Sequence, residues 1–144
     1  MSPRHREVGF AIIIDTQGRF LFHQRDDVPT ITAPGKIGLF GGHREGDETF
    51  LQCAVREVHE EISIFVPPER FVHLWSYKGD DSEIAGGTVI GECYVVREVP
   101  SANVRVTEGS LLIAKREELP SLVPQLTDLT RAAIGYFLSK EQRA

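Results

Sequence analysis

The sequence has few of the features that mark secreted, membrane or nucleic-acid-binding proteins. It contains two cysteines, Cys53 and Cys93, which are too few for a disulfide scaffold and lack a metal-ligand spacing. Its apolar run over residues 10–14 is far shorter than a membrane span, and no signal peptide precedes it. Basic residues number 16 against 21 acidic ones, and this net charge of −5 argues against a nucleic-acid-binding face. These absences predict a soluble, cytoplasmic protein with reduced thiols, in which an anionic ligand needs help from a cation.

The features that are present suit one globular domain spanning residues 1–144. Hydrophobic residues make up 41% and charged residues 26% of the chain, as in ordinary globular proteins. The chain is also long enough to bury a core. Its negative charge is local, because residues 44–61 contain six acidic and two basic side chains while the remainder is nearly balanced. This acidic segment therefore requires an explanation.

Hydrophobic patterning predicts an α+β fold with a mixed β-sheet. Strands are expected over residues 7–15, 20–25, 37–40, 71–78 and 88–97, with weaker strand patterns over 104–107 and 111–114. Residues 26–36 contain Pro29, Pro34 and Gly35 and are expected to form a loop. Helical spacing begins near residue 48, where Asp47 or Thr49 is a candidate cap, and again over 126–140, with a short helix beginning at 115–119. One helix thus follows the third strand and another lies near the C-terminus.

The first of these helices carries three closely spaced glutamates. Glu57, Glu60 and Glu61 stand at positions i, i+3 and i+4, so they project from one side of the helix. The apolar residues occupy another side, namely Leu51, Val55, Val58 and Ile62. Like charges at this spacing repel each other. The triplet is either a solvated charged face or a site for a hard divalent cation such as Mg²⁺ or Mn²⁺.

The wider segment over residues 42–64 closely resembles the signature of the Nudix hydrolase superfamily. In that signature a Gly, five residues, a Glu and seven residues precede Arg-Glu, an aliphatic residue, any residue, Glu-Glu, any residue, Gly and an aliphatic residue. The matching residues are Gly42, Glu48, Arg56, Glu57, Val58, Glu60, Glu61 and Ile64. Ser63 replaces the final glycine, which is the residue best suited to a left-handed helix end. The surrounding pattern agrees with the α/β/α sandwich of the Nudix type.

The resemblance implies that water attacks phosphorus in a nucleoside diphosphate derivative, with Mg²⁺ as cofactor and Mn²⁺ as a substitute. It also implies that Glu57, Glu60 and Glu61 hold the metal, with the carbonyl of Gly42 as a further ligand. Such a metal both neutralises a polyanionic substrate and orients water.

Two further roles concern the signature's remaining residues and a later loop. Arg56 is expected to orient a carboxylate such as that of Glu48, and Glu48 either binds metal or only stabilises its loop. The general base remains open between Glu108, which follows the 104–107 strand pattern, and the signature residues Glu57 and Glu61.

Substrate contacts are expected from Arg25 at the end of the second strand and from His43 or Arg44 just after the glycine pair. These side chains are candidates to meet phosphate oxygens or a sugar. Aromatic residues that either stack on a base or pack in the core are Phe22, Trp75 and Tyr77. The expected partner is a small-molecule nucleotide diphosphate, with no role for a membrane or nucleic acid, and a homodimer is one assembly compatible with a small enzyme.

The leading hypothesis is a Mg²⁺-dependent pyrophosphohydrolase acting on a nucleoside triphosphate, a nucleotide sugar or a dinucleoside polyphosphate. The alternative is a non-catalytic Nudix-fold domain that binds or senses a nucleotide, and a third reading is an interaction domain whose acidic helix meets a basic partner. The intact glutamates favour the enzyme, because adjacent carboxylates oppose an anionic ligand unless a cation lies between them.

Overall fold

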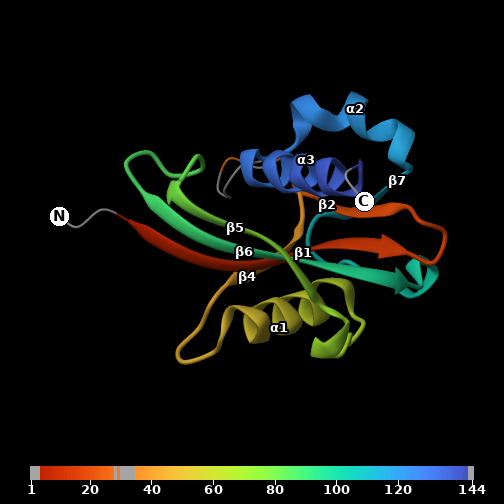
Figure 1. Cartoon of the computed structure of the whole chain (residues 1–144), viewed down its shortest axis with the longest axis horizontal. Helices are drawn as coiled ribbons and strands as arrows, with labels where there is room; N and C mark the ends of the chain where they lie inside the picture. The colour runs from red at the N-terminus through yellow and green to blue at the C-terminus, as the bar shows by residue number, and fades with distance from the viewer. Residues whose placement is uncertain (1–3, 28, 30–34, 143–144) are drawn as a thin grey trace.

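A single mixed sheet forms the centre of the molecule in the computed structural model, which describes residues 4–27, 29 and 35–142 (Figure 1). Its strands are β1 (His5–Asp15), β2 (Phe20–Gln24), β3 (Ile37–Gly38), β4 (Phe40–His43), β5 (Val72–Asp80), β6 (Thr88–Val99) and β7 (Ser110–Ala114). Their main order is β3-β2-β1-β6-β5, while β4 pairs with β1 and β7 pairs with β2. The β1–β6 pair is parallel, whereas the β1–β2 and β5–β6 pairs are antiparallel. The prediction of a mixed sheet is confirmed.

Helices cover both faces of this sheet. One face carries α1 (Phe50–Ile62), and the other carries α2 (Leu119–Leu122) and α3 (Asp128–Gln142) (Figure 1). The 3-10 turns are η1 (Pro68–Arg70), η2 (Ser101–Asn103), η3 (Arg116–Glu118) and η4 (Val123–Gln125). Alternate residues of β1 enter two different cores, with Ala11 and Ile13 on the α1 side and Ile12 and Ile14 on the α3 side. The fold is therefore the predicted helix–sheet–helix sandwich.

The helix that carries the three glutamates has well-defined ends. Thr49 caps its start, because its hydroxyl accepts the Gln52 N–H at 3.0 Å while the Gln52 side chain accepts the Thr49 N–H at 2.8 Å. At the other end Ser63 adopts the left-handed conformation with φ 64°. Its hydroxyl donates to the Arg105 carbonyl at 2.9 Å, which helps to hold the serine where the signature has glycine.

The segment over residues 104–107 is not a strand, so that prediction was wrong. The Arg105 N–H donates to the Ile62 carbonyl at 3.0 Å, and the Arg105 carbonyl accepts from Ser63. These backbone groups hold the segment against the end of α1 and are not used in a strand ladder. Val104 and Val106 pack against the core on that side, which explains the alternating apolar pattern.

Two other predicted segments are a loop over residues 26–36 and a short helix that begins at residues 115–119. Within the expected loop over 26–36, residues 28 and 30–34 lie outside the described residues, and the described ones belong to no helix or strand. The short helix expected at 115–119 begins as η3 and continues as α2.

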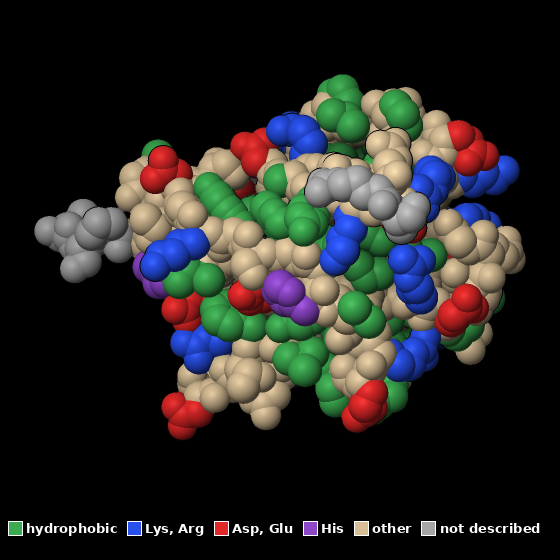
Figure 2. All heavy atoms as spheres, viewed as in Figure 1, with side chains coloured by type: hydrophobic (Ala, Val, Ile, Leu, Met, Phe, Trp, Pro, Cys, Tyr) green, Lys and Arg blue, Asp and Glu red, His purple; other side chains and the backbone are tan. Residues whose placement is uncertain are grey.

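None of the described helices is long and apolar enough to cross a membrane. Figure 2 shows charged side chains of both signs spread over the visible face, as the nearly balanced composition outside residues 44–61 predicts.

Candidate active site

The glycine pair on β4 lets the glutamate face of α1 approach the sheet. A Cβ atom added to Gly42 would lie 2.4 Å from the carboxyl carbon of Glu57, so a larger residue would occupy the space of that carboxylate. The Gly41 N–H donates to Oε1 of Glu61 at 2.7 Å. The β4 backbone thus contacts two of the three glutamates. Glycine is required at position 42 for close approach.

The three glutamates border one small cavity together with Glu108. This polar hollow, of about 210 Å³, is lined by His23, Glu57, Glu60, Glu61, Thr107 and Glu108. The backbone carbonyl of Glu108 pairs with Nε2 of His23 at 2.7 Å, which fixes the loop before β7 beside β2. The structure therefore brings the loop glutamate next to the glutamates of α1, although they are far apart in the sequence.

Burial makes Glu61 the most strongly perturbed of these carboxylates. Desolvation raises its pKa to about 7, against the opposing effect of the hydrogen bond from Gly41 and with a further increase from the nearby charge of Glu57. A buried carboxylate close to like charges is costly to ionise. A cation in this cavity would favour the ionised form.

Arg56 orients the carboxylates of Glu48 and Glu57. Its Nε and Nη2 donate to the two oxygens of Glu48 at 3.1 and 2.7 Å, and its Nη1 donates to Oε1 of Glu57 at 2.8 Å. These hydrogen bonds from Arg56 hold the pKa of Glu48 at about 2. The Glu48 carboxylate also accepts the Glu45 N–H at 2.8 Å, so its observed contacts stabilise the loop before α1.

The donor set around Gly42 suits a hard divalent cation. Carboxylate oxygens and a backbone carbonyl are the ligands that Mg²⁺ and Mn²⁺ prefer. The Gly42 carbonyl also accepts a hydrogen bond from the Cys53 thiol at 3.2 Å. Among the described residues no three His, Cys, Asp or Glu side chains are arranged to hold a metal ion as they stand. Glu57, Glu60 and Glu61 nevertheless line one polar cavity, so their carboxylates are the candidate donors there.

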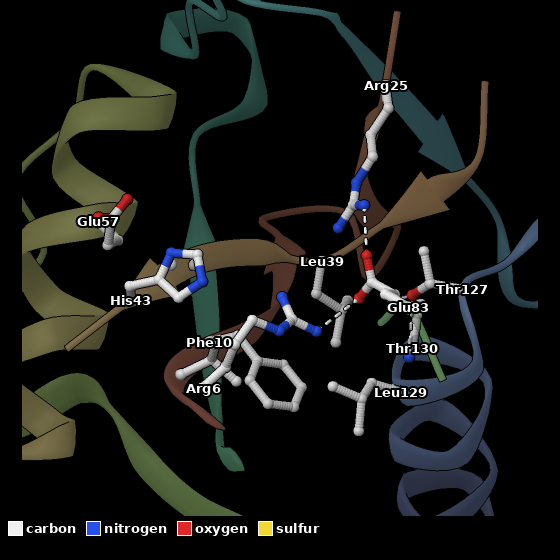
Figure 3. A pocket seen from close by; sticks show the side chains of 13 residues that line it. Arg6, Phe10, Arg25, Leu39, His43, Glu57, Glu83, Thr127, Leu129 and Thr130 are labelled. Carbon is white, nitrogen blue, oxygen red and sulfur yellow. Dashed lines mark hydrogen bonds and ion pairs between the residues drawn. The ribbon is translucent and has the colours of Figure 1, made fainter. Parts of the chain in front are cut away.

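A second cavity adjoins the first and shares Glu57 with it. It has a volume of about 310 Å³ and contains side chains from both ends of the chain (Figure 3). Its lining residues are Arg6, Val8, Phe10, Arg25, Leu39, Gly41, Gly42, His43, Glu57, Glu83, Thr127, Leu129 and Thr130. Arg25 and His43, two of the predicted substrate-binding residues, thus lie beside Glu57 at one hollow.

Arg44, the third predicted substrate-binding residue, is engaged elsewhere. Its Nε donates to Oε1 of Glu7 at 2.8 Å, and its Nη1 donates to the Glu48 carbonyl at 3.0 Å. The guanidinium also lies over the Phe50 ring, 5.5 Å from the centroid. In this structure Arg44 holds the turn between β4 and α1.

Sequence reasoning did not find Arg6 and Glu83, which line the second cavity. Arg6 lies on β1 and Glu83 lies in the connection between β5 and β6, and no motif joins them. Their meeting depends on the parallel pairing of β1 with β6, which only the fold reveals.

The three candidate stacking residues lie in different surroundings. Trp75 and Tyr77 stack on each other, with centroids 5.9 Å apart, and line a further hollow next to Leu129. Phe22 is fully buried in the core, so of its two expected roles the structure supports core packing.

Comparison with known proteins agrees with this architecture. A family model of the NUDIX domain matches residues 3–127. The chain belongs to the Nudix family, whose members generally use divalent metal ions and bind nucleotides. Phosphatase NudJ of Escherichia coli K12 is 33% identical over 70 residues, which cover 47% of this chain and 43% of that protein. The matched part is therefore less than half of that relative.

Solved structures of similar fold cover more of the chain. The MutT protein from Methanosarcina mazei Go1 has a TM-score of 0.79 and 21% identity, with 98% of each chain covered. A bifunctional NMN adenylyltransferase/ADP ribose pyrophosphatase from Francisella tularensis, solved with AMP and a manganese ion, has a TM-score of 0.73 and 19% identity. That match covers 97% of this chain and 42% of the Francisella protein. These similarities confirm the fold.

Proposed function

We propose that this protein is a Mg²⁺-dependent pyrophosphohydrolase that cleaves the diphosphate linkage of a nucleotide derivative by attack of water on phosphorus. The substrate classes considered are nucleoside triphosphates, nucleotide sugars and dinucleoside polyphosphates. The observation that carries the proposal is the junction of two cavities at Glu57. Carboxylates border one cavity, while Arg25 and His43 border the other. A diphosphate spanning this junction meets the guanidinium of Arg25 and the imidazole of His43 in the cavity next to the proposed metal site.

The roles of the residues follow from their positions. Glu57, Glu60 and Glu61 hold the divalent ion, with the Gly42 carbonyl as a further donor. The bound ion supplies charge neutralisation and water activation. Arg56 keeps the Glu57 carboxylate oriented through the 2.8 Å hydrogen bond from its Nη1. Arg25 and His43 bind the anionic part of the substrate.

Glu108 is the proposed general base. Its loop borders the glutamate cavity, and its side chain forms no ion pair with any residue that the structure describes. It accepts a proton from the attacking water as the new P–O bond forms and the bond to the leaving phosphate breaks. Glu61 is the less suitable base, because its carboxylate accepts the Gly41 N–H and belongs to the proposed metal-ligand set.

The decisive experiment is product analysis on a panel of the three substrate classes, with Mg²⁺ and with EDTA. We expect diphosphate cleavage that EDTA abolishes, and a turnover lower by about 100-fold or more in Glu57→Gln. The matched control is Glu69→Gln, because Glu69 is an exposed glutamate in η1, and this variant should retain wild-type turnover. Binding of a panel compound, seen as a thermal shift without any cleavage, would instead indicate a nucleotide sensor.

The base assignment has a separate test. Glu108→Gln keeps the size of the side chain and removes its basicity, so we expect kcat to fall by about 100-fold with KM changed little. A variant with kcat within about threefold of wild type would exclude Glu108 and return the role to Glu57 or Glu61.

A further inference from the structure

Three charged side chains in the wall of the second cavity, Arg6, Arg25 and Glu83, form a chain of contacts with Asp81 behind them. Arg6 from β1 and Arg25, which directly follows β2, both point toward Glu83, as Figure 3 shows. Oε1 of Glu83 lies 2.8 Å from Nη1 of Arg25, and Oε2 lies 3.3 Å from Nη2 of Arg6. Asp81 binds Arg6 through two hydrogen bonds of 2.6 and 2.8 Å. One carboxylate thus joins two guanidinium groups across the hollow.

This network is built into the fold. The Glu83 N–H donates to Oδ1 of Asp81 at 2.9 Å, so the β5–β6 connection fixes the backbone from which Glu83 projects. The Glu83 side chain is only 9% exposed, and that of Asp81 is 1% exposed. Charged groups at this depth need well-formed partners, because desolvation otherwise costs more than the attraction returns. The position of Glu83 is therefore preorganised before any ligand arrives.

Arg25 depends on this anchor for its direction. Its side chain is long, with several rotatable bonds that must be restrained before a guanidinium can bind a ligand in one geometry. Glu83 holds one end of the guanidinium at the cavity wall, with Oε1 2.8 Å from Nη1 of Arg25. Arg25 lines the same cavity as Glu57, so the two side chains face one space.

We infer that Glu83 is a positioning residue that acts through Arg25, directing its guanidinium toward the diphosphate part of the nucleotide. This inference rests on the proposed function, since it takes the ligand of the second cavity to be a diphosphate. Arg6 and Asp81 stabilise the position of Glu83. Arg6 pairs with the second oxygen of Glu83, and Asp81 binds Arg6 through two hydrogen bonds. Preorganisation of this kind strengthens binding by reducing the ordering that a ligand must impose.

Substitutions at Glu83 separate positioning from simple charge. Glu83→Asp keeps the charge but shortens the side chain, so it no longer reaches both guanidinium groups, whereas Glu83→Gln removes the charge. We expect both variants to raise KM for the hydrolysed panel compound by about fivefold to tenfold, with kcat within about twofold of wild type. If Glu83 only reduced the positive charge of the cavity, Glu83→Gln would lower KM and Glu83→Asp would match wild type. That pattern would overturn the inference.

A double-mutant cycle tests whether Glu83 acts through Arg25. Arg25→Gln alone should raise KM at least as much as Glu83→Gln, and the double variant should be no worse than Arg25→Gln. Effects on KM that multiply in the double variant would show that the two residues act independently, which contradicts the inference. Arg25→Gln and Glu83→Asp provide the comparison even if Glu83→Gln folds poorly, and thermal unfolding midpoints are measured for every variant.

A binding measurement keeps this inference distinct from the proposed function. Imidodiphosphate, whose P–N–P bridge resists hydrolysis, is titrated with Mg²⁺ into each protein by calorimetry. Its Kd should rise by about fivefold in Glu83→Asp and stay unchanged in the Glu69→Gln control. If the wild type cleaves no panel compound, the proposed function fails, while the imidodiphosphate titration still tests Glu83. Equal Kd values for wild type and Glu83→Asp, or no binding to the wild type, would refute the role of Glu83.

Discussion

At the scale of single residues, the glutamate site depends on Gly42, which has no side chain. Gly42 leaves the space in which the Glu57 carboxylate lies, and the neighbouring Gly41 donates its N–H to Glu61. A larger residue at position 42 would meet the Glu57 carboxylate, whereas a Cβ at position 41 would lie 2.4 Å from the Gly9 carbonyl oxygen and from the Cβ of Phe10. Gly42 is thus required by the position of Glu57 on the facing helix, and Gly41 by the close approach of β1.

Gly42→Ala should damage activity much more than stability. The added Cβ would lie 2.4 Å from the carboxyl carbon of Glu57, the mobile end of a side chain that can move aside. A catalytic group displaced by about 1 Å costs about 100-fold in turnover, so displacement of the Glu57 carboxylate should lower kcat by that order. Thermal unfolding should change by only a few degrees, as measured by circular dichroism. Wild-type kcat in this variant would show that the observed position of Glu57 is not the active one.

At the scale of elements, α1 has one face that packs in the core and another that lines the glutamate cavity. Its apolar side packs against the sheet, including Ala54, Val58 and Ile62, which are fully buried. A different side presents carboxylates to the cavity beside the loop of Glu108. The end of the helix at Ser63 also holds the 104–107 segment, which leads into that loop. The helix therefore positions both groups of candidate catalytic residues.

Ser63 variants test how this helix end is held. Ser63→Ala keeps a Cβ in the left-handed conformation and loses the hydrogen bond to Arg105, so the free energy of unfolding should fall by about 1 kcal/mol. In Ser63→Gly the relief of backbone strain offsets the lost hydrogen bond, and stability should stay within about 0.5 kcal/mol of wild type. Urea denaturation measures both values. Equal destabilisation by alanine and glycine would show that the hydroxyl, and not the backbone conformation, dominates.

At the scale of the whole molecule, the burial of Glu61 makes the free energy of unfolding depend on pH. Burial raises the pKa of Glu61 to about 7, whereas the unfolded chain has the ordinary value of 4.5. Between these values the folded protein binds more protons than the unfolded one. This difference contributes stability that is complete below pH 4.5 and is lost as the pH rises toward 7.

Glu61→Gln should remove this pH dependence. In EDTA, the melting temperature of the variant should rise relative to that of wild type as the pH increases from about 5 to 8, because only the wild type must bury a charge. Addition of Mg²⁺ at pH 8 should stabilise wild type and have less effect on the variant. A difference in melting temperature that stays constant with pH would contradict the raised pKa of Glu61.

The amino-acid sequence by itself determined the family and the main elements of this protein. The signature over residues 42–64 identified the glutamate helix, because helical spacing alone brings Glu57, Glu60 and Glu61 to one side. Period-two and helical patterns also located the principal strands and the terminal helix. Local patterning did not settle residues 104–107, where backbone hydrogen bonds to α1 replace the expected strand pairing.

Only the tertiary structure decided which distant residues share a cavity. Arg6, Arg25 and Glu83 meet because β1 pairs in parallel with β6 and antiparallel with β2, and no local pattern encodes those pairings. The tertiary structure likewise brought Glu108 to the glutamates and engaged Arg44 with Glu7. Spacing along one helix is set by covalent geometry, whereas contacts between strands are set by packing of the entire core.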